Sequence, residues 1–217
     1  YADLGYRTVS TNPCGEIPLC PYDSCRLLAI NLYSYVENTF TPEAKFNFEL
    51  FKEHIHYAQR IMDDIIDLEL EKIDAILEKL DSDPEEEEIK YVEKSLWNKI
   101  KQKANEGRRT GIGITAEGDM LAALGLQYGS DIAVDFSEEI HKTIALEAYR
   151  SSVFLAKERG PFAIYDAKRE ANNPFINRLK NADAKLHADM MKYGRRNIAL
   201  LTIAPTGTTS LMTQTTS

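Results

Sequence analysis

Apolar residues recur at helical spacing through much of this chain. Between residues 46 and 80 they return every three or four positions, which predicts a helix of about ten turns. Thr41, Pro42 and Glu43 stand just before this run. A capping hydroxyl, a first-turn proline and an early acid favour a helix N-terminus, so we expect the long helix to begin there.

A second helix is expected directly after the first. Residues 82–85 form another N-terminal signal, and the helix that follows is expected to stop at Gly107. The two helices would form a hairpin over residues 41–106, with the acidic run DSDPEEEE at its tip. Such a run is typical of a solvated helix start, so we interpret the hairpin as a peripheral elaboration.

The second half of the chain mixes helices with extended segments. Thr115 predicts the cap of a helix after the stretch RRTGIGI, and another helix is expected over residues 137–159, closed by Gly160. Residues 195–210, RRNIALLTIAPTGTTS, combine a buried strand with a turn rich in hydroxyl groups. Long helices that alternate with a few buried strands indicate an α/β fold in which helix predominates.

Composition narrows the class of protein. With 217 residues, 43% of them hydrophobic, the chain can bury a sizeable core. A formal net charge of −8 argues against broad nucleic-acid binding, and no apolar run approaches the roughly 20 residues of a membrane span. We find no basic-then-apolar leader, so we expect a cytoplasmic protein without a membrane partner. Because the chain opens with Tyr1, we also expect it to be a segment of a larger chain.

All three cysteines lie in one loop, TNPCGEIPLCPYDSC, which covers residues 11–25. Their C-x5-C-x4-C spacing lacks the close pairs of a zinc ribbon, so no metal site is predicted. His54 and His56 are two apart on a helix and face different ways, which argues against a chelating pair. The glycines of GRRTGIGITAEG lack the spacing of a dinucleotide loop, and close packing of a strand against a helix explains them better.

Asn12, Cys14 and Glu16 alternate in the first part of the cysteine loop. Pro13 restricts the backbone there and Gly15 permits an unusual conformation, so the turn is expected to be rigid. In an extended or looped segment, residues two apart point to the same side, so one ligand could meet an amide, a sulfur and a carboxylate. The residues alone leave two other interpretations open: a buried cysteine in an ordinary turn, and a cysteine hydrolase.

Three motifs, in this order, favour the ligand-binding turn over the two other interpretations. They are TNPCGEIPL with PYDSCRLLAINL, then GRRTGIGI, then IAPTGTTS. With them the chain resembles, over nearly its whole length, the catalytic barrel of ribonucleotide reductases, and more narrowly the adenosylcobalamin-dependent class II branch. The stretch GITAEGDM departs from the glycine-leucine-alanine sequence of many relatives, at a packing element.

The resemblance implies an α/β fold: part of a ten-stranded reductase barrel with a central finger loop and long outer helices. Within the segment 1–217, residues 1–40 would supply the finger loop and adjoining strand, and residues 41–106 the helical hairpin. Residues 107–217 would supply further helices and a strand that ends in a phosphate-binding loop.

By this resemblance, Cys14 becomes a thiyl radical that takes the 3′-hydrogen of a ribose, and Glu16 is the acid–base group on the 3′-hydroxyl. Asn12 orients the ribose. Cys25 is one of two cysteines that supply the reducing electrons and end as a disulfide, with its partner expected outside this chain. Cys20 has no role in the family pattern and is expected to be a buried thiol.

Substrate phosphates are assigned by the resemblance to the C-terminal loop. Independently of any family, consecutive backbone N–H groups and hydroxyls after a buried strand suit an anion. A Thr/Ser turn without function is the alternative. The residues of this loop are Pro205, Thr206, Gly207, Thr208, Thr209 and Ser210.

The implied activity is radical-based reduction of ribonucleotides to 2′-deoxyribonucleotides for DNA synthesis. It would use adenosylcobalamin as cofactor, a ribonucleoside di- or triphosphate as substrate and a thioredoxin-like reductant. The remaining part of the reductase chain is an expected partner, a homodimer stays open, and the isolated segment is expected to be inactive. Two alternatives remain: a class I large-chain segment served by a separate radical-generating subunit, and an inactive nucleotide-binding fragment.

Overall fold

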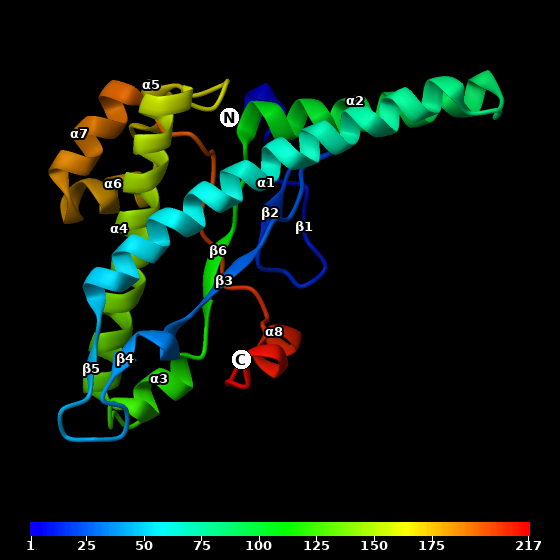
Figure 1. Cartoon of the computed structure of the whole chain (residues 1–217). Coiled ribbons are helices and arrows are strands. Elements are labelled where there is room, and N and C mark those ends of the chain that lie inside the picture. Colours follow the sequence, from blue (N-terminus) through cyan, green and yellow to red (C-terminus); the bar gives the residue numbers. More distant parts are fainter.

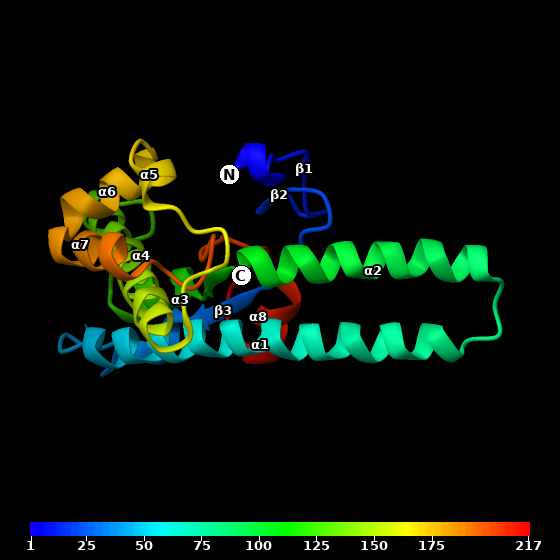
Figure 2. The ribbon, with the colours of Figure 1, turned by 90° about the horizontal axis from the view of Figure 1, so that it is seen from above.

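Two long antiparallel helices dominate the chain (Figures 1 and 2). In the computed structural model, which describes residues 1–217, α1 spans Phe48–Ser82 and α2 spans Glu87–Gly107. The outer halves of both helices extend away from the rest of the molecule as a hairpin (Figure 2). No helix in the structure combines the length and the apolar content that crossing a membrane requires.

The predicted start of α1 is wrong by several residues. Thr41 lies in a turn, where its hydroxyl donates to the Asn38 carbonyl at 2.8 Å. The helix begins at Phe48, and the Asn47 side chain caps it by accepting from the Leu50 amide at 3.0 Å. A strand between turn and helix overrides the local signal: β5 (Lys45–Phe46) pairs antiparallel with β4 (Val36–Glu37).

The boundaries of α2 also differ from the prediction. Since α1 continues through Ser82, residues 82–85 form its last turn and the connection, and α2 starts at Glu87. Gly107 is the last helical residue, as expected. The left-handed residue that ends the helix is Arg108, with φ 50°, and its side chain lies in a buried ion pair.

A small parallel sheet crosses the centre of the molecule (Figure 1). Strand β3 (Leu28–Asn31) pairs in parallel with β6 (Ile112–Thr115), and residues 199–202 run along the other side of β6. Ile112 donates to the Leu200 carbonyl at 2.7 Å, and its own carbonyl accepts from the Thr202 amide at 3.0 Å. These strands do not close a barrel within this chain.

The strand predicted within residues 195–210 is therefore only partly formed, since a single bridge joins Leu201 to β6. Close contact of backbones explains the glycines of β6. A Cβ on Gly113 would lie 2.3 Å from the Thr202 carbonyl oxygen. The predicted strand–helix packing is thus wrong, and the glycine allows one extended segment to approach another.

Further helices cover the sheet. α4 (Asp131–Arg159) packs along α1, and it begins six residues before the prediction because Ser130 caps it. Gly160 ends α4 with φ 85°, as predicted. Thr115 does not cap α3 (Glu117–Ala123), since Ala116 occupies that position. The remaining elements are η1 (Ala2–Leu4), β1 (Ser10–Thr11), β2 (Pro18–Leu19), η2 (Leu32–Tyr35), α5 (Ala167–Glu170), α6 (Pro174–Ala182), α7 (Ala184–Tyr193) and α8 (Gly207–Thr213).

A buried polar network links α1 to the segment that leads into the last strand. Asp63 is fully buried and accepts from Arg108 at 2.8 Å, Arg196 at 3.2 Å and Arg159 at 3.3 Å. The Asn197 amide donates to the same carboxylate at 3.0 Å. Each charge in this network has a partner, so it stabilises the packing of the helices around the sheet.

Candidate functional site

The cysteine loop forms a short hairpin in which β1 and β2 are antiparallel (Figure 1). Asn12 closes its turn: its backbone N–H donates to Ile17 O at 3.1 Å, and its side-chain oxygen accepts from the Ile17 amide at 2.9 Å. Gly15 has φ 86°, a conformation that favours glycine. The tight turn leaves the Cys14 thiol exposed at the tip.

Cys25 lies against this turn. The Asn12 side-chain amide donates to the Cys25 sulfur at 3.5 Å. Burial, and after it the negative charge of nearby Glu16, raise the pKa of the Cys25 thiol, while the bond from Asn12 opposes them. The one direct contact among the four predicted residues of the loop is thus that between Asn12 and Cys25, while Cys14 and Glu16 lie in the same turn.

Glu16 has an uncommon environment. Both of its carboxylate oxygens are buried, and neither has a hydrogen-bond partner in the protein. Its backbone carbonyl accepts from the Thr202 hydroxyl at 3.2 Å, which anchors the turn to the segment beside β6. A buried carboxylate without a partner carries a desolvation cost, so this side chain suits a hydroxyl donor supplied by a ligand.

The base of the hairpin is held by a buried ion pair that the sequence analysis did not anticipate. Arg109 donates to the Asp23 carboxylate at 2.6 Å, and the Asp23 side chain is 3% exposed. The Cys20 thiol donates to the same carboxylate at 3.5 Å. Burial and the charge of Asp23 raise the pKa of Cys20 to about 11. Cys20 is thus a buried, neutral thiol, as expected.

The C-terminal loop leads into the short helix α8. The amides of Gly207, Thr208 and Thr209 donate no hydrogen bond within the protein, and the hydroxyls of both threonines are also without partners. Thr206 and Ser210 are buried, and the Thr206 hydroxyl accepts from Thr115 at 3.1 Å. A cavity of about 110 Å³ lies between this loop and the strands β3 and β6.

The two predicted parts of the site are linked indirectly. No hydrogen bond joins the cysteine turn to residues 205–210. The connection is through Thr202, which binds the Glu16 carbonyl and lies three residues before Pro205. The same segment pairs with β6, so the sheet sets the separation of the two parts.

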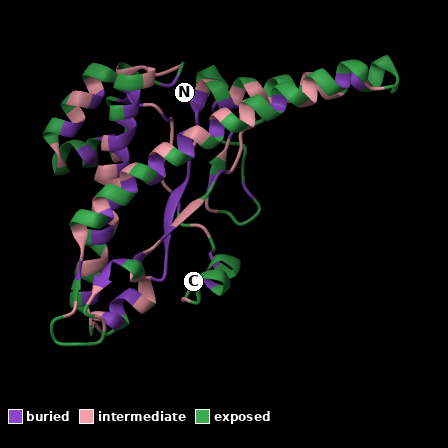
Figure 3. Cartoon of the chain, in the orientation of Figure 1, coloured by how far each residue is buried: buried purple, intermediate pink, exposed green.

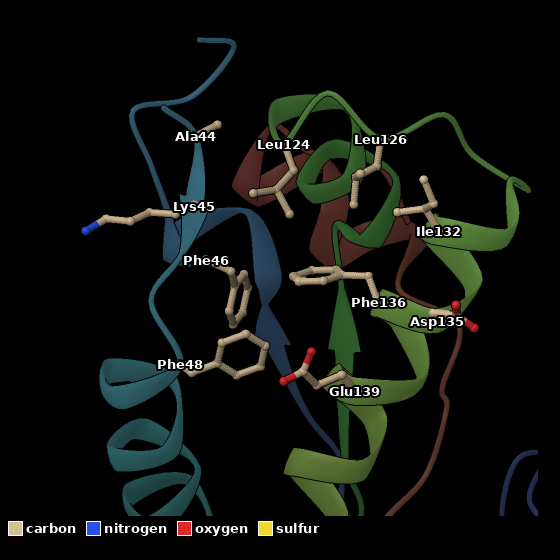
Figure 4. Close-up of a pocket in the computed structure, with 10 residues that line it drawn as sticks. All are labelled: Ala44, Lys45, Phe46, Phe48, Leu124, Leu126, Ile132, Asp135, Phe136 and Glu139. Atoms are coloured by element: carbon tan, nitrogen blue, oxygen red, sulfur yellow. The ribbon is translucent and has the colours of Figure 1, made fainter. Parts of the chain in front are cut away.

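The largest cavity lies elsewhere, at about 580 Å³ between β5, the end of α3 and the start of α4 (Figure 4). The rings of Phe46, Phe48 and Phe136 form its wall, and Lys45 points away from it (Figure 4). No cysteine lines it. Asp135 and Glu139 are its carboxylates, so it lacks the pairing of a thiol with a carboxylate that the cysteine loop has.

Two candidate clusters are accounted for by ordinary partners. Carboxylate oxygens of Asp63, Asp64 and Asp67 lie within 4.8 Å of one another, but Arg108 and Arg159 bind them, so the group is an ion-pair network. His54 and His56 face different ways as predicted: His54 bonds to the Tyr35 hydroxyl at 3.0 Å, and His56 to Glu147 at 2.9 Å. The pairs of adjacent arginines at 108–109 and 195–196 were the available sequence signal for the buried networks.

Comparison with known proteins gives a consistent result. The family model described as ribonucleotide reductase, barrel domain, matches residues 5–217. The vitamin B12-dependent ribonucleoside-diphosphate reductase of Mycobacterium tuberculosis is 29% identical over 97% of this chain and 23% of its own length. The enzyme of the same name from Thermoplasma acidophilum is 31% identical over 94% of this chain and 20% of its own length.

Other relatives carry different names. The ribonucleoside-diphosphate reductase subunit alpha of Chlamydia pneumoniae is 30% identical over 92% of this chain and 19% of its own length. The class Id ribonucleotide reductase alpha subunit of Actinobacillus ureae superposes with a TM-score of 0.62 at 20% identity, covering 100% of this chain and 32% of that one. These matches confirm the expected α/β barrel fold, and the chain spans about a fifth of the curated relatives' length.

Proposed function

This chain belongs to the ribonucleotide reductase family, as a segment of its barrel domain, and from that premise we propose its function. It forms the part of a catalytic chain that carries the radical cysteine and the phosphate loop for reducing ribonucleotides to 2′-deoxyribonucleotides. One observation carries the proposal: the buried, unpartnered carboxylate of Glu16 beside the exposed Cys14 thiol in a closed turn.

In the first step, the Cys14 thiyl radical takes the hydrogen atom from C3′ of the ribose, which becomes a carbon radical, while an S–H bond forms. Glu16 takes the proton of the 3′-hydroxyl, which its unpartnered oxygens are placed to accept. The 2′-hydroxyl then leaves as water. Asn12 is fixed by two bonds to the Ile17 backbone, one donated by its own N–H and one accepted by its side-chain oxygen, which supports its role in orienting the sugar.

The reducing step involves Cys25 and a second cysteine outside this chain. Their two thiols give two electrons and two protons, ending as a disulfide: one proton leaves with the water and one hydrogen is gained at C2′. The second electron goes to the 3′-carbonyl, and Glu16 returns its proton to the 3′-oxygen. Cys14 then returns the hydrogen to C3′ and becomes a radical again. The raised pKa of Cys25 supports this role, because the thiol keeps its hydrogen at neutral pH.

Substrate phosphates would bind at Pro205–Ser210. The free amides of Gly207, Thr208 and Thr209 and the free hydroxyls of the two threonines support this assignment, since each can donate to a phosphate oxygen. The adjoining cavity of about 110 Å³ is lined from this loop by Pro205, Thr206 and Thr209.

For the cofactor, we propose adenosylcobalamin, which the names of the Mycobacterium and Thermoplasma relatives support. It would supply the radical that Cys14 receives. None of the sizeable cavities is lined by Cys14, so the residues of this segment do not themselves fit a corrin ring, and its contacts are assigned outside the segment. The Chlamydia relative favours the alternative, a class I chain served by a separate radical-generating subunit.

The remaining proposals concern partners. A thioredoxin-like reductant would reduce the disulfide of Cys25, the rest of the reductase chain would complete the barrel, and a homodimer stays open. The cytoplasm is the proposed location, where deoxyribonucleotides are made and thiols stay reduced.

The test joins this segment to its natural flanking sequence and compares Cys14→Ser with Cys25→Ser. Cys14→Ser is expected to lower ribonucleotide reduction at least about 10³-fold, because it removes the hydrogen-abstracting atom, while circular dichroism stays unchanged. Cys25→Ser is expected to abolish multiple turnover but to keep hydrogen exchange at C3′. Reduction that persists in Cys14→Ser contradicts the proposal, and reduction without added adenosylcobalamin favours the class I alternative.

A further inference from the structure

Residues 204–217, which contain the proposed phosphate loop, are tied to the rest of the protein at one junction. Every hydrogen bond that leaves this segment goes to the connection between β6 and α3, at Thr115, Ala116 or Asp119. Helix α8 is largely exposed and lies apart from the helical body (Figures 1 and 3). Besides the chain connection itself and the contacts of the loop with β3 and β6, these three residues hold the segment.

Thr216 forms hydrogen bonds with all three residues of the junction. The Asp119 carboxylate accepts from the Thr216 backbone N–H at 2.5 Å and from its hydroxyl at 2.9 Å. The Thr216 carbonyl accepts from the Ala116 amide at 3.1 Å and from the Thr115 hydroxyl at 3.2 Å. Two residues beyond the end of α8, the Thr215 amide donates to the Ser210 carbonyl at 3.0 Å, which links Thr216 to the helix.

Thr115 also contacts Thr206, near the N-terminal end of the phosphate loop. The oxygen of the buried Thr115 hydroxyl lies 3.1 Å from the Thr206 hydroxyl oxygen, so one side chain contacts both ends of residues 206–216. The next residue, Ala116, is fully buried and has φ 64°, a left-handed conformation that an alanine adopts at a cost. Ala116 thus turns the chain from β6 into α3 at the residue whose amide binds Thr216.

The junction also connects the two parts of the site. Thr115 is the last residue of β6, and the same strand pairs with the segment that holds Glu16 through Thr202. The distance between the cysteine turn and the phosphate loop is thus set along one strand. A loop that is already ordered before phosphate binds avoids the entropy cost of becoming ordered on binding.

We propose that Asp119, with Thr115 and Ala116, is a positioning residue that clamps the phosphate loop for substrate binding. The clamp rests on the proposed function, because the ligand of the loop is the ribonucleotide phosphate. Asp119 touches no reacting atom. Its loss is expected to weaken substrate binding and to leave the chemical step unchanged.

The experiment uses the segment joined to its natural flanking sequence. Asp119→Ala is expected to raise KM for the ribonucleotide about tenfold with kcat within twofold, because two hydrogen bonds to a charged group are lost. Asp119→Asn is expected to restore most of the binding, since its amide oxygen still accepts from Thr216. Asp135→Ala is the matched control: this exposed aspartate has no hydrogen-bond or ion-pair partner and its loss is expected to change neither constant.

Hydrogen–deuterium exchange at residues 206–216 provides a readout that needs no activity. Exchange there is expected to accelerate in Asp119→Ala and, more weakly, in Thr216→Val, with the rest of the chain unchanged. Unchanged exchange and KM, a fall in kcat at constant KM, or faster exchange throughout the chain would each overturn the clamp. If the unmutated chain reduces no ribonucleotide, the proposed function fails, while exchange still decides whether the clamp exists.

Discussion

Two buried carboxylates, Glu16 and Asp63, lie in contrasting surroundings. Asp63 has bonds from three arginines and an asparagine amide. Glu16 has none on either oxygen. In most folded proteins a buried charge is paired. Asp63 therefore has the environment of a structural group, whereas the environment of Glu16 suits a group that binds a ligand. The regions around them differ accordingly: ion pairs bind the Asp63 carboxylate itself, while the turn around Glu16 is held by bonds to its backbone.

The largest effect is expected from Asp63→Ala. It leaves Arg196 without its counter-charge and Arg108 with only the half-exposed Asp67, and should lower the free energy of unfolding by about 3–5 kcal/mol. Chemical denaturation of the chain measures this change. Asp67→Ala is the matched control: Asp67 also binds Arg108, but its side chain is 46% exposed, so a loss below about 1 kcal/mol is expected. Equal losses of unfolding free energy in Asp63→Ala and Asp67→Ala would contradict the structural role assigned to Asp63.

Glu16→Gln is expected to lower the activity and to leave the stability unchanged, in contrast to Asp63→Ala. Because no protein group pairs with this carboxylate, a neutral amide should leave the unfolding midpoint unchanged or raise it. Ribonucleotide reduction by the joined chain should fall about a hundredfold or more, since the proton acceptor is lost. A mutant that unfolds more readily and keeps its activity would reverse the roles assigned to Glu16 and Asp63.

The smallest effect concerns the thiol at the base of the hairpin. Burial raises the pKa of Cys20 from 9.0 to about 11, so the folded state favours the protonated thiol. Its contribution to stability is complete below pH 9 and is lost as the pH rises towards 11, by about 1–3 kcal/mol. Unfolding midpoints between pH 8 and 11 should therefore fall less in Cys20→Ala than in the unmutated chain. Parallel curves would show that Cys20 is not buried beside Asp23.

The sequence by itself determined the features that depend on neighbouring residues. The period of apolar positions predicted the long helix within Phe48–Ser82 and the helix that ends at Arg159. The alternation of Asn12, Cys14 and Glu16 predicted a shared turn, because residues two apart in such a segment are close whatever surrounds them.

Only the tertiary structure decided the features that join distant residues. Strand pairing between Val36–Glu37 and Lys45–Phe46 moved the start of α1 away from Thr41. The hydroxyl of Thr115, expected to cap a helix, instead binds Thr206, which is 91 residues away. Local propensity amounts to a fraction of a kilocalorie per residue, whereas burying a polar group without a partner costs about 1–3 kcal/mol, so distant partners override local signals.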